Sequence, residues 1–241
     1  MTRYQELAAD LRRRIARGEF AVGAPLPSEL RLADEYRASR GAIRNALQLL
    51  ERGGMVESAP GSGWTVASAL QTMEFRRART FAEWAQAHGL EPGGRVVAAS
   101  GGVPSAAEAS ALRIGAHEPV LRVTRLRLLD GRPVMLERTV YPPWVAPLIR
   151  ALPPDEPSVV RVMRKHGIHP VRASHRIDAL AASSEDARLL GIRRSSPLLR
   201  VRRTFADEHG RPIELGDDRY LAGAVGFGIE VEPRSERFLD S

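Results

Sequence analysis

The chain contains no cysteine, and Lys165 is the only lysine among its 36 basic residues. The absence of cysteine excludes a disulfide framework and fits a reducing compartment. No apolar run is long enough to span a bilayer, and the first residues lack the apolar core of an export signal. A length of 241 residues suffices for two domains, each with its own core. We therefore expect a soluble, cytoplasmic protein without a membrane partner.

The net charge of +7 says little about a nucleic-acid partner. Residues 1–66 contain ten arginines and eight acidic residues, a difference of 10 − 8 = +2. The near-absence of lysine is what a biased genomic base composition would produce. Any argument for DNA binding must therefore rest on where the charges lie.

Three helices and a short hairpin are predicted in this first segment. Apolar residues recur at helical spacing over 4–15. Serines are placed as N-caps of helices over 28–36 and 39–52. Two short strands, 55–57 and 64–66, surround a glycine-rich tip. This order is typical of a winged helix-turn-helix.

The third helix has an apolar side and, roughly opposite, a polar side. Arginine can bind guanine or phosphate, asparagine or glutamine can bind adenine, and a wing without bulky side chains can approach the minor groove. For an isolated helix, an ordinary solvated face would be the better interpretation. The complete arrangement favours DNA binding, with candidate contacts Ser39, Arg40, Gly41, Arg44, Asn45, Gln48, Gly61 and Ser62.

These residues carry a family resemblance. The runs Leu26-Pro27-Ser28-Glu29, Ser39-Arg40-Gly41-Ala42-Ile43-Arg44-Asn45-Ala46-Leu47 and Gly61-Ser62-Gly63 resemble the winged-helix domain of GntR-family bacterial repressors. The resemblance implies that Arg40, Arg44 and Gly61 contact DNA. Leu30 and Ala42 replace polar residues that many relatives have, so two of the family's DNA contacts are expected to be absent and the operator sequence is left open.

The remaining sequence divides into a linker over 67–79 and a second, mixed α/β domain over 80–236. The linker contains a cluster, Arg76, Arg77 and Arg79, that either touches DNA phosphates or is simply solvated. The second domain is predicted to contain a hairpin of strands 120–129 and 133–141 around Asp130-Gly131. Further strands are expected at 96–100, 171–180, 198–206, 212–215 and 225–231, and helices at 105–113, 158–166 and 185–190.

An internal repeat lies within this domain. Pro119-Val-Leu-Arg-Val-Thr-Arg125 is similar to Pro197-Leu-Leu-Arg-Val-Arg-Arg203, and a Gly-Arg-Pro sequence follows each copy. Tyr141 and Tyr220 each lie eight residues beyond the proline of that sequence. The repeat predicts a sheet with a pseudo-two-fold axis, and a ligand site where the halves meet.

Behind a GntR-type winged helix, this arrangement resembles the UTRA effector-binding domain of the HutC subfamily. The resemblance implies an α+β protein whose second domain has a mainly antiparallel, chorismate-lyase-like sheet. It also implies a homodimer and an anionic effector bound by Arg125 and Arg127, with Glu137, Glu214 and Tyr220 binding hydroxyls or amides. Ser158 is a further candidate, because a predicted helix N-terminus offers free N–H groups to an anion.

Two observations leave the ligand open. A two-residue turn at Asp130-Gly131 would place Glu137 on the face opposite Arg125 and Arg127, unless a bulge changes the register. The chain also reads Gly223-Ala224-Val225 after its final tyrosine, where relatives have Gly-Asp-Arg. The candidate effectors are a sugar phosphate, a phosphonate or a small carboxylate.

We predict a transcriptional repressor that binds a palindromic operator in the nucleoid, with no catalytic residue, bound metal or cofactor. An enzyme acting on a sugar or acyl substrate is one alternative, although no nucleophile elbow, phosphate loop or metal-spaced histidine cluster supports it. A related regulator with an all-helical, metal-dependent ligand domain is another. The two Gly-Arg-Pro hairpins argue against that alternative.

Overall fold

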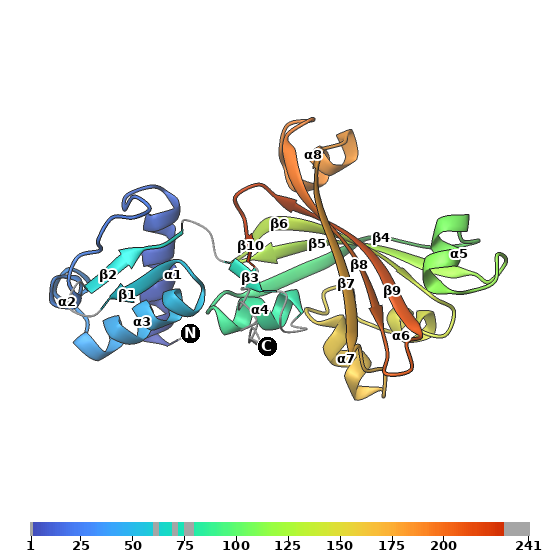
Figure 1. The fold of residues 1–241 in the computed structure, drawn as a ribbon, viewed down its shortest axis with the longest axis horizontal. Helices are drawn as coiled ribbons and strands as arrows, with labels where there is room; N and C mark the ends of the chain where they lie inside the picture. The colour runs from blue at the N-terminus through green and yellow to red at the C-terminus, as the bar shows by residue number, and fades with distance from the viewer. Residues whose placement is uncertain (1, 60–62, 69–71, 75–79, 229–241) are drawn as a thin grey trace, which may run out of the picture.

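The structure, a computed structural model, describes residues 2–59, 63–68, 72–74 and 80–228 (Figure 1). Gly61 and Ser62 of the predicted wing tip lie outside the described residues, as do the linker arginines 76, 77 and 79 and residues 229–236. The first part of the chain forms the expected winged helix. Its elements are α1 (Arg3–Ala16), α2 (Glu29–Tyr36), α3 (Arg40–Arg52), β1 (Val56–Ala59) and β2 (Gly63–Val66).

The winged helix forms because its apolar stripes meet and its helix ends are capped. Leu7, Leu11 and Ile15 of α1 are buried in one core together with Leu32, Ile43, Leu47 and Leu50 of the other helices. The Ser39 hydroxyl accepts a hydrogen bond from the Ala42 N–H at 3.2 Å, which fixes the start of α3. Arg37 ends α2 with φ of 48°, so the break predicted there is confirmed.

The second domain is built around a six-stranded antiparallel sheet with the order β4-β5-β6-β9-β8-β7. A separate parallel pair joins β3 to β10. The elements, in chain order, are β3 (Thr72–Glu74), α4 (Phe81–Ala87), β4 (Pro92–Gly102), α5 (Ala106–Leu112), β5 (Val120–Leu129), β6 (Arg132–Tyr141), α6 (Ala146–Arg150), α7 (Val159–Lys165), β7 (Arg172–Ala181), α8 (Ser184–Leu190), β8 (Pro197–Ala206), β9 (Pro212–Leu221) and β10 (Gly226–Gly228).

The internal repeat is confirmed by this topology. The sequence β4-α5-β5-β6 is repeated as β7-α8-β8-β9, and the two copies meet at the centre of the sheet, where β6 pairs with β9. The connection between the copies, residues 142–171, holds α6 and α7, which have no counterpart within either copy. The all-helical alternative is therefore wrong.

The β5–β6 hairpin has the predicted two-residue turn, and it also has a bulge. Asp130 and Gly131 have φ of 49° and 77°, as a tight type I′ turn requires. Leu128 pairs with Pro133, but Arg127 pairs with Met135, so one extra β6 residue shifts the register. The bulge that the sequence left open is therefore present, and it places Glu137 directly opposite Arg125 rather than on the other face of the sheet.

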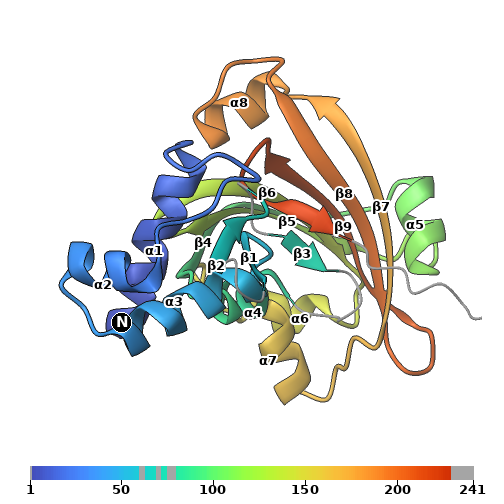
Figure 2. The same cartoon turned by 60° about the vertical axis from the view of Figure 1, so that its left-hand side comes forward.

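Helices cover the two faces of the sheet unequally (Figure 2). Aromatic residues of α4 and apolar residues of α6 and α7 pack on the face that carries Met135, Tyr141 and Tyr220. Leu190 of α8 packs on the other face, against Leu126 and Leu136. The sequence prediction was incomplete for this domain. The elements α4, α6 and β3 were not predicted, and β9 is longer than the predicted strand 212–215, reaching Leu221.

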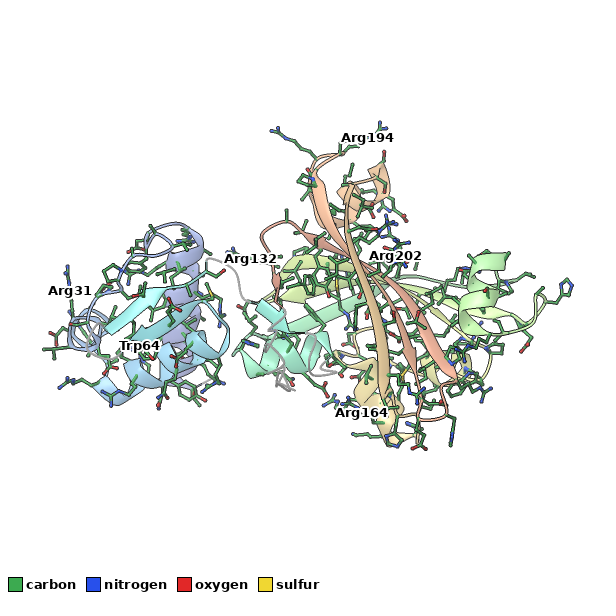
Figure 3. All side chains as sticks on the ribbon, viewed as in Figure 1. Arg31, Trp64, Arg132, Arg164, Arg194 and Arg202 are labelled. Atoms are coloured by element: carbon green, nitrogen blue, oxygen red, sulfur yellow. The ribbon has the colours of Figure 1, made fainter. Side chains whose placement is uncertain are left out.

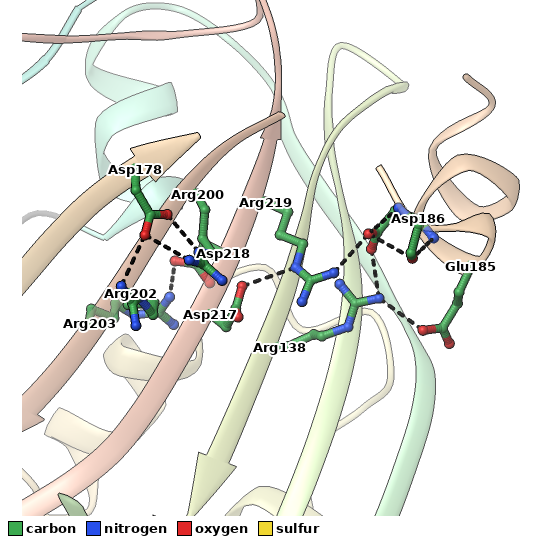
Figure 4. A network of polar contacts seen from close by, with 11 residues as sticks. Arg138, Asp178, Glu185, Asp186, Arg200, Arg202, Arg203, Asp217, Asp218 and Arg219 are labelled. Carbon is green, nitrogen blue, oxygen red and sulfur yellow. Dashed lines mark hydrogen bonds and ion pairs between the residues drawn. The ribbon is translucent and has the colours of Figure 1, made fainter. Parts of the chain in front are cut away.

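A ladder of ion pairs crosses the α8 face of the sheet (Figure 4). Arg200 donates to Asp178 at 2.6 and 2.7 Å, which joins β8 to β7. Arg219 donates to Asp186 at 2.7 Å, and Asp186 also pairs with Arg138 at 2.9 Å. These contacts join α8 to β6 and β9. Figure 3 shows how arginine side chains, Arg194 and Arg202 among them, populate this side of the domain.

Among the described residues, the contacts between the two domains include buried polar groups. Arg12 of α1 donates to the His88 carbonyl at 2.7 Å, and its Nη1 lies 3.8 Å from the Asp130 carboxylate at the β5–β6 turn. The His88 ring contacts the carbonyl of Arg52, the last residue of α3, at 3.1 Å. A Cβ on Gly89 would lie 2.6 Å from Leu49 Cδ2, so glycine permits this close approach.

Candidate functional site

The polar side of α3 is exposed and free of the winged-helix core. Ile43, Ala46, Leu47 and Leu50 are buried, whereas the predicted DNA contacts of this helix are exposed: Ser39, Arg40, Gly41, Arg44, Asn45 and Gln48. The sequence therefore divided the helix correctly into a core face and an available face. The DNA major groove is wide enough for an α-helix, and the exposed polar side chains of α3 can bind the base edges there.

Glu29 connects three elements of the winged helix beside this face. Its carboxylate accepts hydrogen bonds from Arg44 at 2.7 and 3.1 Å and from the Trp64 indole N–H at 3.3 Å. The hydrogen bond from Arg44 is the main reason why the pKa of Glu29 is lowered, since it outweighs the opposing effect of burial. Glu29 therefore orients Arg44 and ties the start of α2 to α3 and the wing.

A second candidate site lies in the sheet domain, on the face covered by α4 and α7. It is a cavity of about 70 Å³ that residues from both halves of the repeat surround. Polar groups come from five neighbouring strands and from the N-caps of α4 and α7, and aliphatic and aromatic residues complete the lining. The polar lining consists of Thr80, Arg127, Glu137, Tyr141, Ser158, His175, Arg203, Glu214, Asp218 and Tyr220.

Arg203 occupies the centre of this polar lining. Its guanidinium donates to Glu214 at 3.0 Å, to Glu137 at 3.1 Å and to Asp218. Gly216 stands directly across the β8–β9 ladder, and a Cβ there would lie 2.7 Å from Arg203 Cζ. Glycine at this position therefore lets the guanidinium lie against β9, where three carboxylates reach it.

The two arginines of β5 are held differently from Arg203. Arg127 donates to the Glu137 carboxylate at 2.7 Å and to the Pro157 carbonyl at 3.0 Å. Arg125 is only 3% exposed and makes one long contact, 3.5 Å, with the Glu156 carbonyl. Its Nε has no hydrogen-bond partner among the described residues. A buried donor without a partner is unusual.

Two carboxyl groups of the cavity have opposite pKa shifts. Burial alone would raise the pKa of Glu137, but the positive charges of Arg127 and Arg203 outweigh burial and lower it. Burial raises the pKa of Glu214 above its ordinary value, and the nearby negative charge of Glu137 adds to that rise against the influence of Arg203. Burial also raises the pKa of the Tyr141 and Tyr220 hydroxyls, so both stay protonated.

Most of the sequence-predicted effector residues come together in this cavity. Arg127, Glu137, Glu214 and Tyr220 line it, and Arg125 lies behind it next to Glu137. Ser158 also lines the cavity, where its hydroxyl caps α7 by accepting the Arg161 N–H at 3.4 Å.

Sequence reasoning missed Arg203, Asp218 and His175. The repeat contained the signal for Arg203, because it aligned Arg203 with Arg125. Thr80 was also missed, although it forms a capping box with Glu83 that marks the start of α4. No comparable pattern distinguishes Asp218 from the neighbouring Asp217, because only the register of β9 decides which of them faces the cavity.

Among the described residues, no group of three or more potential ligands is placed to hold a metal ion. No helix in the described ranges is long and apolar enough to cross a membrane. The cavity contains charged groups, but they are engaged in mutual ion pairs rather than arranged as a nucleophile and its base.

A winged helix with an exposed polar recognition face, joined to a sheet domain with a buried polar cavity, defines a two-domain transcription regulator. The chain belongs to the bacterial regulatory proteins of the gntR family that carry a UTRA domain. The gntR family matches residues 3–66, and the UTRA domain matches residues 87–225. The predicted GntR-family, HutC-type regulator and its α+β fold are confirmed, and the chain is a DNA-binding regulator rather than an enzyme.

The chain is similar to characterised relatives along most of its length. It is 27% identical over 222 residues to the HTH-type transcriptional repressor NagR of Bacillus subtilis, covering 89% of this chain and 90% of that protein. The crystal structure of PhnF from Mycobacterium smegmatis matches with a TM-score of 0.64 at 27% identity, covering 94% of this chain and 99% of that one.

A third relative matches about a quarter of the chain. The Exu regulon transcriptional regulator of Escherichia coli is 49% identical over 65 residues, which is 27% of this chain and 25% of that protein.

Proposed function

We propose that the protein is a repressor that binds a palindromic operator as a homodimer in the cytoplasm, and that a small metabolite with an anionic group modulates this binding. The exposed polar face of α3 carries the proposal, because a dimer would present two such faces to successive major grooves. The names of NagR and PhnF as repressors support the direction of regulation.

In this proposal Arg40 and Arg44 have different roles on DNA. Arg40 is exposed at the first turn of α3, where recognition helices contact base edges. Arg44 is held by Glu29 in the DNA-free structure. A guanine or a phosphate would take the place of the carboxylate or share the guanidinium with it, so Glu29 keeps Arg44 oriented before DNA arrives.

An electrophoretic shift with DNA from upstream of the gene tests this function. We expect a specific complex that weakens steeply with salt, and a footprint with two equivalent half-sites. Arg40→Ala is expected to weaken operator binding by about 1–3 kcal/mol, or roughly 5- to 150-fold. The absence of a salt-sensitive specific complex would contradict the proposal.

Arg176→Ala is the matched control for this experiment, since it removes the same charge from an exposed position of β7 in the other domain. It is expected to change operator affinity by less than about twofold, since a distant charge is screened by salt. Equal losses in the two variants would mean that total charge, and not the α3 face, determines binding. The mass of the protein in solution tests the homodimer independently.

The cavity of the sheet domain is the proposed effector site. Arg125 and Arg127 supply positive charge for an anionic group, and Glu137, Glu214 and Tyr220 supply polar groups around it. Ser158 contributes to the same wall from the start of α7. Binding there changes operator affinity because the β5–β6 hairpin extends from the cavity to the contact with Arg12.

A further inference from the structure

The two halves of the repeat place opposite net charge around the cavity. The first half contributes Arg127 and Glu137 in the lining and Arg125 behind it, next to Glu137, which sum to +2 − 1 = +1. The second half contributes Arg203, Glu214 and Asp218, which sum to +1 − 2 = −1. All six side chains are buried, so these charges are weakly screened by solvent. The site is neutral as a whole and polarised along the sheet.

The acidic side has an excess of acceptors. Three carboxylates, Glu137, Glu214 and Asp218, converge on the single guanidinium of Arg203. Asp218 Oδ1 is buried and has no hydrogen-bond partner among the described residues. The raised pKa of Glu214 has the same origin, because burial and the charge of Glu137 oppose its ionisation. A donor with positive charge would relieve both conditions.

The basic side has a matching excess of donors. Arg125 is buried, and its Nε has no partner among the described residues. It lies across from Glu137, which already accepts hydrogen bonds from Arg127 and Arg203. An acceptor with negative charge would satisfy Arg125.

From this polarity we infer that the effector is a small zwitterion, with its cationic nitrogen toward Glu214 and Asp218 and its anionic group toward Arg125 and Arg127. The inference rests on the proposed effector site and specifies the class of ligand. A dianion without a compensating cation would add two negative charges to a buried region that is already neutral. A zwitterion adds none.

The cavity size sets the scale of the ligand. A volume of about 70 Å³ holds roughly five water-sized groups. Small amino acids and their phosphonate or sulfonate analogues are closer to this size than a phosphorylated hexose is.

Three pairs of compounds test the inference, each pair differing only in its ammonium group. The pairs are 3-aminopropanoate and propanoate, 2-aminoethanesulfonate and ethanesulfonate, and 2-aminoethylphosphonate and ethylphosphonate. Propylamine serves as the cation without an anion. Calorimetry and thermal denaturation of the full chain measure binding without DNA. We expect at least one amino member to bind and to raise Tm, and its deaminated partner to bind at least about tenfold more weakly.

Any other ranking overturns the inference. Equal or tighter binding of a deaminated member or of propylamine would show that one charge suffices, and no binding by any amino member would exclude zwitterions of this size. The operator shift experiment without these compounds decides the proposed regulator separately. Failure of the zwitterion and failure of the regulator are therefore distinguishable.

Substitutions in the cavity test where the ammonium group of the zwitterion binds. Asp218→Asn is expected to reduce the preference for the amino member over its deaminated partner by at least about tenfold, because the charge is removed at nearly constant shape. Asp217→Asn, on the opposite face of the same strand, is the matched control and should retain the preference. Glu214→Gln provides a second variant if Asp218→Asn does not fold. An unchanged preference in the folded variant contradicts the assignment.

Discussion

Arg125 and Arg203 occupy equivalent positions in the two halves of the sheet domain, yet their surroundings differ. Arg125 faces Glu137 across the β5–β6 ladder, while Arg203 faces Gly216 across the β8–β9 ladder. Both hairpins have a bulge just after the equivalent proline. The same backbone therefore holds one arginine without a carboxylate hydrogen bond and another with three. The repeat supplies the position, and the neighbouring strands decide what the arginine does.

Removal of each arginine should have unequal effects on stability. Arg203→Ala leaves three carboxylates without their shared guanidinium, so we expect a loss of about 3–5 kcal/mol in the free energy of unfolding. Arg125→Ala removes packing but no carboxylate hydrogen bond, so we expect a loss of about 1–2 kcal/mol. Urea denaturation of both variants measures the difference.

Arg202→Ala is the control, because Arg202 neighbours Arg203 but lies on the α8 face, where its side chain is 42% exposed. Its ion pair with Asp178 should contribute about 0–1 kcal/mol. Equal losses for Arg203 and Arg125 would mean that the two halves are energetically equivalent despite their different partners.

Gly216→Ala should remove the difference between the surroundings of Arg125 and Arg203, because Gly216 lies opposite Arg203 on β9. The added Cβ would meet Arg203 Cζ at 2.7 Å, so the guanidinium must leave its place against β9. We expect a loss of about 1–3 kcal/mol, as for other overpacked sites. Thermal denaturation measures it. Gly131→Ala is not a suitable control, because its φ of 77° adds backbone strain. An unchanged Tm would contradict the close approach.

The pH dependence of stability should distinguish Glu137 of the first half from Glu214 of the second half, although the expected effect is smaller. The pKa of Glu214 is raised, so its contribution to stability falls as pH increases from 4.5, its ordinary value, through its folded-state pKa. The pKa of Glu137 is lowered, so its contribution is present above 4.5 and is lost as pH falls through its folded-state pKa.

Comparison of the wild type with Glu214→Gln and Glu137→Gln by urea denaturation at several pH values tests these signs. The difference between wild type and Glu214→Gln should decrease as pH rises above 4.5. The difference between wild type and Glu137→Gln should increase as pH rises toward 4.5. Slopes of the same sign in both comparisons would refute the opposite environments of the two carboxyl groups.

Local sequence patterns predicted the winged helix well, because caps and apolar spacing within each helix specify its elements. Capping serines at positions 28 and 39 and the spacing of leucines each specify one feature of α2 or α3. The same was true of the turn at Asp130-Gly131, where both residues have the positive φ that the sequence indicated. These signals are close together in the sequence, so few other local structures compete with the observed one.

The cavity was predicted less completely, because its register depends on contacts distant in sequence. The bulge after Arg127 reverses which β6 residues face the arginines, and the turn sequence alone does not show it. Asp218 joins Arg203 only because β9 continues past residue 215 and pairs with β8. These features arise from packing between halves about eighty residues apart, which periodicity in one segment does not describe.

The contacts of Arg12 indicate how strongly the two domains are held together. Burial lowers the pKa of this guanidinium to about 10 against the opposing influence of Asp130, and its Nε and Nη1 have no hydrogen-bond partner among the described residues. A contact that satisfies its donors so incompletely contributes about 1 kcal/mol net. Allosteric coupling between two sites amounts to about 1–3 kcal/mol. A ligand would thus need to supply only a small part of its binding energy to separate α1 from the β5–β6 turn.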